Sequence, residues 1–293
     1  MKLQILILLV LLGCNNNVNS PAEYEEWKTK RKSALYADDG YLNLAGLYPI
    51  EDGNYTVGYG DHNDIRLPVD FPVDFGNVEV EDSSIIFNFN ESVYMNDSIE
   101  SKSFKYNYYE NRNNFSYGSF IWYVHMDSGV KGIRLRNIKH PLLDNDLKIE
   151  FFSYNPLMIV NAKFEEYSKP LIKKLNNIQG GVFNDTIPGL IHFNINNQAH
   201  TFQPTISPSG KFFIVFGDKT NGKETYGGGR FLYLAPPEKD GNLIIDFNKA
   251  YNPPCVFSTF TTCPVPSKEN ILTFPVDAGE KNYNGILFSS VYQ

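Results

Sequence analysis

The sequence predicts a mainly β protein, with antiparallel barrel-like or sandwich-like sheets and one helix near the N-terminus. Aromatic residues make up 15% of the chain, with 19 Tyr and 22 Phe, and such side chains favour pleated, half-buried strands. A capping pattern near residue 20 marks the helix. From Tyr41 onward, turn-forming pairs recur, most of them between apolar or aromatic runs, and predict an antiparallel sheet: Asp52-Gly53, Ser128-Gly129, Asn196-Asn197, Ser209-Gly210, Asn221-Gly222 and Asp240-Gly241.

The first residues predict an export signal at residues 1–13. A charged start at Met1-Lys2 precedes a short apolar run and then Gly13-Cys14, and that run is too short to span a bilayer permanently. Leu11-Leu12-Gly13-Cys14 resembles the lipobox of lipoprotein signal peptidase, although Leu12 is bulkier than usual. We expect cleavage before Cys14, lipid on Cys14 and a place in the cell envelope, facing the periplasm. An ordinary cleaved signal or an uncleaved anchor would also put the protein outside the cytosol.

A polar tether at residues 14–19 and one β-rich domain over residues 20–293 are expected to follow. Ser20-Pro21-Ala22-Glu23 combines a capping serine, a proline at the first helical position and a glutamate three residues after the cap. Asp39-Gly40 is expected to end the helix. Residues at helical spacing then form a stripe that can pack on the rest of the protein: Tyr24, Trp27, Arg31 and Leu35.

The clearest strands are rich in β-branched and aromatic residues. The stretch from Lys169 to Gly189 contains Pro, Asn and Gly and is a candidate join between two sub-lobes. The predicted strands are Phe120 to Val124, Leu157 to Phe164, Ile191 to Ile195, Phe212 to Phe216, Phe231 to Leu234 and Leu243 to Phe247.

Charge and motif patterns argue against several functional classes. The formal net charge is −7 and basic runs are scarce, whereas nucleic-acid binding needs a basic stripe. The five histidines lack the spacing of metal ligands, and no Gly-x-Ser-x-Gly elbow of a serine hydrolase occurs. We therefore expect no nucleic-acid partner and no metal, and the sequence assigns no cofactor.

Two glycine-containing segments invite ligand-binding interpretations that their spacing does not favour. Asp218 to Glu224 places its glycine one position too early for a calcium loop, so Asn221-Gly222 is expected to form a hairpin turn. Gly227-Gly228-Gly229 precedes a strand, whereas a phosphate loop must open a helix. The three glycines predict that another group approaches the backbone closely or that the strand bends sharply. Arg230 is then expected to lie on an open surface.

The segment from Tyr226 to Lys281 gathers most candidate site residues. It sets groups that can donate, accept, ionise or attack among prolines and glycines, and such stiff chain suits the wall of a pocket. Asp246 and Glu280 are acid–base candidates or acceptors of structural ion pairs; we favour the structural role for Asp246 and leave Glu280 open. The ligand-binding candidates are Tyr226, Arg230, Asn248, Asn252, Lys281 and His192. His192 lies outside the segment, and a hydrogen-bonded strand residue is the favoured interpretation for it.

Cys255 and Cys263 have three interpretations, and any catalytic role depends on which holds. A disulfide is permitted by an oxidising compartment and would contribute roughly 2 to 3 kcal/mol in the loop-entropy model. A reactive thiol would need its pKa lowered by a cation such as Arg230 or Lys281. Two buried inert thiols are the third state.

Several motifs in this region resemble the domain of unknown function 1684 family. They are Thr225-Tyr226-Gly227-Gly228-Gly229-Arg230-Phe231-Leu232, Asp246 to Cys255, Cys263-Pro264-Val265-Pro266 with Asn270, and Ala278-Gly279-Glu280-Lys281. Upstream, Gly40 to Tyr48 and Gly132-Ile133-Arg134-Leu135-Arg136 look like earlier motifs of the family. The resemblance implies a shared fold and pocket but no activity. Members also occur without export signals, which weakens the disulfide and favours a pocket thiol.

The function expected from the sequence is an envelope lipoprotein with a small-molecule pocket, binding or catalytic, formed by the C-terminal motifs. Arg230 and Lys281 would hold an anionic group, because guanidinium forks bind carboxylate or phosphate through paired hydrogen bonds, and Glu280 or Asp246 would act as base. The alternative is a non-catalytic scaffold that binds a protein partner through the Tyr/Phe-rich face between Phe104 and Tyr123. Whether the protein is an enzyme, and its oligomeric state, are left open.

Overall fold

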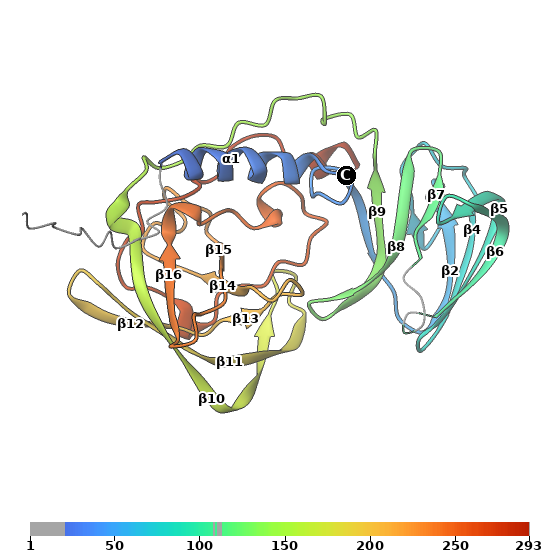
Figure 1. The fold of residues 1–293 in the computed structure, drawn as a ribbon. Coiled ribbons are helices and arrows are strands. Elements are labelled where there is room, and N and C mark those ends of the chain that lie inside the picture. Colours follow the sequence, from blue (N-terminus) through green and yellow to red (C-terminus); the bar gives the residue numbers. More distant parts are fainter. Residues whose placement is uncertain (1–20, 108, 110–112, 293) are drawn as a thin grey trace, which may run out of the picture.

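The structure is a computed structural model that describes residues 21–107, 109 and 113–292. The predicted signal peptide (1–13), the lipidated Cys14, the tether (14–19) and the capping Ser20 lie outside the described residues. The described chain is mainly β, with curled, barrel-like sheets and one α-helix at its N-terminal end, which confirms the predicted fold class (Figure 1). None of the helices in the described part is long and apolar enough to cross a membrane.

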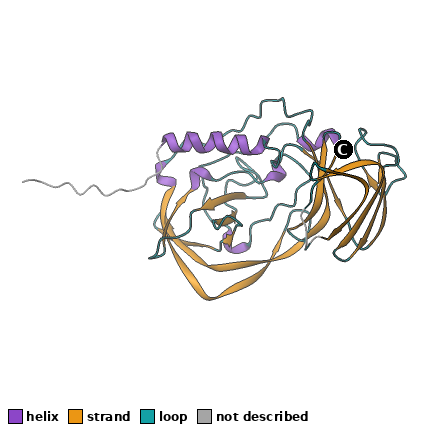
Figure 2. Cartoon of the chain, turned by 45° about the vertical axis from the view of Figure 1, so that its right-hand side comes forward, coloured by secondary structure: helices purple, strands orange, loops and turns teal. Residues whose placement is uncertain are grey.

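The helix α1 (Pro21–Tyr36) packs on the protein through the predicted stripe. Tyr24 and Leu35 are only 2% and 1% exposed, and Trp27 and Arg31 are half-buried. In Figures 1 and 2 the helix runs along one side of the C-terminal half of the molecule. It ends before Gly40, whose amide donates to the carbonyl of Ala37 at 2.7 Å.

Nine strands form an N-terminal lobe around one apolar core. The sheet order is β1-β9-β8-β7-β5-β4-β2-β3, with β6 on β5, and only the β2–β3 pair is parallel among these pairings. Inside, Phe89 packs on Phe75 and Trp122. The strands are β1 (Leu44–Pro49), β2 (Gly53–Gly58), β3 (Ile65–Arg66), β4 (Gly76–Glu81), β5 (Ser84–Met95), β6 (Ile99–Asn107), β7 (Phe115–Tyr117), β8 (Phe120–Asp127) and β9 (Val130–Asn137).

The aromatic segment between Phe104 and Tyr123 contributes its rings mainly to this core. Successive side chains of a strand point to opposite faces, and here the large rings take the inner face. The prediction that they offer a docking face to a protein partner is therefore wrong for five of them, each at most 6% exposed: Phe104, Tyr106, Phe115, Phe120 and Trp122.

A C-terminal lobe follows, with two sheets around a second apolar core. A four-stranded sheet has the order β12-β11-β10-β16, and a three-stranded sheet the order β13-β14-β15. All six predicted strands are present, with bounds shifted by a few residues in several cases. They correspond to β8, β10, β11, β14, β15 and β16. The strands of this lobe are β10 (Ile159–Asn176), β11 (Val182–Ile195), β12 (Gln198–Phe202), β13 (Thr205–Ile206), β14 (Phe212–Phe216), β15 (Arg230–Leu234) and β16 (Asn242–Asp246).

The stretch from Lys169 to Gly189 lies in the long β10–β11 hairpin, so its interpretation as a join between sub-lobes is wrong. The pairing register shifts between Glu166 and Leu171. Pro170 and Pro188 lie at this irregularity, where a missing amide donor is tolerated. The prolines that suggested a join thus mark a bulge within a hairpin, which bends around the base of the C-terminal lobe (Figure 1).

A third apolar cluster contains residues from both ends of the chain. Leu35 of α1 and Leu42, which precedes β1, meet Phe257 and Phe288 from the C-terminal part. Five short 3-10 helices lie in the C-terminal half: η1 (Pro156–Met158), η2 (Phe247–Lys249), η3 (Pro254–Val256), η4 (Lys268–Asn270) and η5 (Phe288–Tyr292). One domain over residues 20–293 stays a prediction.

Candidate functional site

Arg230 is fully buried, so the prediction that it presents an open surface is wrong. Its exposed fraction is 0%, and Nη2 donates to Asp218 Oδ2 at 2.7 Å and to the Val276 carbonyl at 2.8 Å. Nη1 donates to the carbonyl of Ala278. The guanidinium thus joins β15 to the chain that follows Leu272, and these contacts give Arg230 a structural role.

Gly229, directly before Arg230, allows the chain to pack closely. Gly229 has φ +91°, and a Cβ there would lie 2.4 Å from Pro266 Cγ and 2.7 Å from the Phe216 carbonyl oxygen. The predicted close approach to the backbone is confirmed, but the approaching atoms belong to the protein. A side chain at position 229 would collide with these atoms, so the position requires glycine.

Asp218 organises the connection between β14 and β15. Its Oδ1 accepts from the Thr220 amide at 2.8 Å, from Thr220 Oγ1 at 2.6 Å and from the Val276 amide at 3.2 Å. The strands form an antiparallel pair, but the connection takes residues 217–229. Asn221-Gly222 therefore lies within a longer loop and does not form the two-residue hairpin turn that was predicted.

Glu280 is a buried acceptor beneath α1. Oε1 accepts from Arg31 Nε at 2.9 Å, and Oε2 from the Asn252 amide at 2.7 Å. Arg31 Nη2 also donates to the Asn252 carbonyl at 3.0 Å, and Asn252 Nδ2 to the Lys281 carbonyl at 2.7 Å. These contacts fasten the helix to the C-terminal segment, and the Lys281 ammonium lies 5.0 Å from the centre of the Phe152 ring.

Asp246 and Asn248 form a separate structural contact. Asp246 Oδ1 accepts from the Asn248 amide at 3.1 Å and from its side chain at 3.0 Å. Asn248 in turn exchanges two hydrogen bonds of 2.9 Å with the backbone of Asn155. This geometry agrees with the structural role that we favoured for Asp246.

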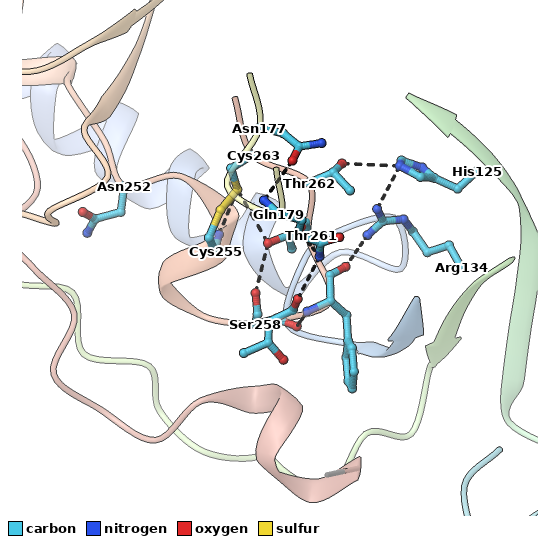
Figure 3. Close-up of a disulfide and its surroundings, with 12 residues drawn as sticks. His125, Arg134, Asn177, Gln179, Asn252, Cys255, Ser258, Thr261, Thr262 and Cys263 are labelled. Atoms are coloured by element: carbon cyan, nitrogen blue, oxygen red, sulfur yellow. Dashed lines mark hydrogen bonds between the residues drawn. A yellow bond between two sulfur atoms is a disulfide. The ribbon is translucent and has the colours of Figure 1, made fainter. Parts of the chain in front are cut away.

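The structure joins Cys255 and Cys263 in a disulfide, the first of the three predicted states (Figure 3). Residues 255–263, the disulfide loop, contact both lobes. Gln179 Nε2 donates to the Thr261 carbonyl at 2.8 Å, and Arg134 Nη1 of β9 donates to the Phe260 carbonyl at 2.7 Å. In the disulfide, neither sulfur is a free nucleophile.

The last two predicted residues lie apart from the others. His192 is partly exposed on the four-stranded sheet, 3.0 Å from Glu165 Oε2, beside a shallow hollow of about 470 Å³ that Lys163 and Asn242 also line. Tyr226 is half-buried against the third apolar cluster. The predicted residues thus fall into separate groups: Asn252 contacts Glu280 and Lys281, Asp246 contacts Asn248, and Cys255 is bonded to Cys263. Arg230 reaches the first group's segment through the Ala278 carbonyl.

Two buried arginines that the sequence did not single out, Arg134 and Arg136, lie on β9 and face the disulfide loop. They are 4% and 8% exposed, and they occupy alternate positions opposite Ile133 and Leu135, which line the N-terminal core. Arg136 Nη1 donates to Asn43 Oδ1 at 2.7 Å and to the Gly40 carbonyl. Among the described residues, no carboxylate forms an ion pair with either guanidinium.

His125 of β8 lies beside Arg134. Its Nε2 lies 3.2 Å from Arg134 Nη2 and 3.4 Å from Thr262 Oγ1 (Figure 3). Because a guanidinium only donates, Nε2 is the acceptor and the ring is neutral. Burial, together with Arg134, lowers the pKa of His125 to about 4. Burial also lowers the pKa of Arg134.

Tyr123 and Tyr41 lie beside these arginines. Tyr123 Oη accepts from Arg136 Nη2 at 3.4 Å. Arg136 also contacts Gly40 and Asn43, and Tyr41 lies between these two residues in the sequence. Burial raises the pKa of the Tyr41 hydroxyl, and the charges of Arg134, Arg136 and Arg31 oppose this rise. We define the Arg–Tyr cluster as Arg31, Tyr41, Tyr123, Arg134, Arg136, Tyr233 and Tyr251.

The C-terminal lobe contributes Tyr233 and Tyr251 to the cluster. Their rings are stacked, with centres 6.2 Å apart and planes 23° apart, and Arg31 lies 4.5 Å from the centre of the Tyr251 ring. Burial raises the pKa of Tyr233, and a neighbouring Tyr41 adds to this rise. The cluster thus unites side chains from α1, the segment before β1, β8, β9, β15 and the chain that follows η2.

The cluster consists of hydrogen-bond donors with surplus positive charge. Guanidinium forks hold carboxylate or phosphate through paired bonds, and phenol groups add single donors. Glu280 lies beside it, but both of its oxygens accept from Arg31 and Asn252. Elsewhere in the described chain, no group of three His, Cys, Asp or Glu side chains is arranged to hold a metal ion.

Fold and cluster together define a mainly β protein in which two lobes meet at a set of arginines and tyrosines. Residues 147–281 match the model of the family described as "Protein of unknown function (DUF1684)". This match supports the resemblance of the C-terminal part of the chain to the DUF1684 family. The matched residues include the C-terminal motifs, whereas the earlier segments Gly40 to Tyr48 and Gly132 to Arg136 lie outside them.

Among solved structures, the chain is similar to an uncharacterized protein of Haloarcula marismortui that was determined by solution NMR. The two are 27% identical, the match covers 47% of this chain and 77% of the other, and the TM-score is 0.40. No curated protein matches the chain.

Proposed function

We propose that the protein is a lipid-anchored envelope protein that binds a small anionic molecule at the Arg–Tyr cluster. One observation carries the binding proposal: Arg134 and Arg136 are more than nine-tenths buried, and no carboxylate of the described chain pairs with them. Buried charges are normally paired, since removing a lone charge from water costs several kcal/mol. A carboxylate or phosphate supplies the missing charge.

The surroundings of the cluster favour binding over catalysis. A general base needs a free lone pair near the substrate. Glu280 and His125, the nearest candidates, already accept hydrogen bonds from Arg31 and Arg134. The anion-holding role foreseen for Arg230 and Lys281 moves in this proposal to Arg134 and Arg136.

The test is a titration of the purified soluble domain, followed by calorimetry, with four probes: methyl phosphate, acetate, phenyl phosphate and benzoate. We expect saturable binding of at least one probe. Arg134→Gln and Arg136→Gln should each weaken it by about 10- to 100-fold, because each removes a charge-assisted hydrogen bond of about 1.5–3 kcal/mol. Arg66→Gln is the matched control, since the Arg66 side chain is 59% exposed and pairs with Asp61.

Folding of each variant is checked by circular dichroism. If a glutamine variant unfolds, Arg134→Lys keeps the charge but loses the planar fork, and we expect it to fold and to bind more weakly. Absence of saturable binding for all four probes, or equal affinity in Arg134→Lys and the Arg66→Gln control, would overturn the proposal.

The lipid anchor on Cys14 is tested separately. The lipobox-like Leu11-Leu12-Gly13-Cys14 supports it. We expect the mature protein to need detergent for extraction from membranes and to begin at an acylated Cys14 by mass spectrometry. Cys14→Ser should accumulate as the uncleaved precursor, whereas Cys263→Ser should be processed normally. A mature chain that begins elsewhere and is released in aqueous buffer contradicts the anchor.

A further inference from the structure

The Arg–Tyr cluster contains exposed aromatic side chains as well as buried arginines. Tyr41 is 39% exposed and Tyr233 is 45% exposed, whereas Arg134 and Arg136 are buried. The chain around Tyr41 is held in position by two hydrogen bonds that Arg136 donates, to the Gly40 carbonyl and to the Asn43 side chain. The charged end of the cluster is thus enclosed, and its aromatic side is open to solvent.

The aromatic side is a preformed row of rings on the three-stranded sheet. Tyr233 stacks on Tyr251 at 6.2 Å and also packs on Phe213 at 4.9 Å. Tyr251 in turn meets the edge of Phe231 at 5.9 Å. Because these neighbours fix the ring of Tyr233, little conformational entropy is lost when a further ring packs against it.

We propose that the anion bound at this cluster is carried by a molecule with a flat ring, such as an aryl phosphate or an aryl carboxylate. The inference rests on the proposed function. Arg134 and Arg136 hold the anionic group, and the ring packs against Tyr41 and Tyr233. Stacked or tilted aromatic pairs gain affinity beyond the burial of their area, so Tyr233 distinguishes ring-bearing anions from small aliphatic ones.

The four probes form two matched pairs that isolate the ring. Phenyl phosphate and methyl phosphate carry the same phosphate group, and benzoate and acetate the same carboxylate. We expect the ring-bearing member of at least one pair to bind about 10-fold more tightly to the wild-type domain. Tyr233→Leu should abolish this ratio and leave the affinity for the methyl compound within about twofold of wild type.

Tyr94→Leu is the matched control, because Tyr94 is 43% exposed on β5 of the other lobe. It should keep the wild-type ratio. Tyr41→Phe retains an aromatic ring and should also show the wild-type ratio, whereas Tyr41→Leu should reduce the ratio. Since the exposed Tyr233 contributes little to the core, its leucine variant is expected to fold.

The outcomes separate the two proposals. If no probe binds, the proposed function fails and the ring preference falls with it. If methyl and phenyl compounds bind equally, the anion site stands and the ring inference is overturned. A ring preference that survives in Tyr233→Leu equally overturns the assignment to this ring.

Discussion

The arginines of this protein show that one residue type takes different roles according to its partners. Arg230 forms an ion pair with Asp218 at 2.7 Å, so its charge is compensated within the C-terminal lobe. Arg134 meets a carbonyl and an imidazole, which are both neutral. Neutral acceptors satisfy donors but leave the charge uncompensated. The second situation is the one on which the proposed anion site rests.

His125 makes the stability of the protein depend on pH. Its pKa is about 4 in the folded protein, against about 6.5 when unfolded. Between these values the unfolded state binds more protons, so the free energy of unfolding rises with pH and falls as the solution is acidified. We expect His125 to account for a loss of about 2–3 kcal/mol between pH 7 and pH 4.5.

Urea denaturation at both pH values measures this loss. His125→Gln lacks the titrating ring, so it should lose less stability on acidification than wild type by about that amount. His62→Gln, at an exposed ring, should follow the wild type. Parallel behaviour of all three proteins would show that His125 does not titrate abnormally.

At the scale of elements, the disulfide loop is the joint between the lobes. Its carbonyls accept from Arg134 on one side and from Gln179 of the β10–β11 turn on the other. The same turn reaches the N-terminal lobe directly, because Asn177 Nδ2 donates to the Ser128 carbonyl at 2.6 Å. The loop therefore fixes acceptors that hold Arg134 in place.

Opening the disulfide should lower the free energy of unfolding by about 2–3 kcal/mol, as the loop-entropy model gives for a short loop. Urea denaturation with and without dithiothreitol measures the change. A Cys255→Ala, Cys263→Ala double variant should match the reduced protein and ignore the reductant. Alkylation of both thiols in the native protein before reduction would show that the disulfide is absent.

At the scale of the whole molecule, the proposed site needs both lobes. The family match at residues 147–281 covers most of the C-terminal lobe, which supplies Tyr233 and Tyr251. Arg134 and Arg136 lie upstream of it on β9, and Arg31 comes from α1. A fragment limited to the matched residues would lack all three arginines of the cluster.

Local patterns predicted most of the elements correctly. The stripe from Tyr24 to Leu35 and the strand at Phe212 to Phe216 follow from periodicity and residue type, which act within a few residues. Ser128-Gly129 turns at φ 52° and 78°, as its composition indicates. Pro170 and Pro188 gave the wrong prediction of a join between sub-lobes, because proline occurs both in linkers and at β-bulges. Only strand pairing distinguishes the two.

By itself, the sequence determined the fold class, the helix, the main strands and the segment where Glu280, Asn252 and Lys281 meet. The tertiary structure decided that Arg230 is paired with a carboxylate and that, among the described residues, Arg134 and Arg136 are not. The signal for the latter was present in Gly132-Ile133-Arg134-Leu135-Arg136, where two arginines share one face of a strand. Whether a carboxylate faces them depends on residues distant in the sequence, such as Asn43 and Phe260, 93 and 126 positions away, because charge compensation is set by distance in space.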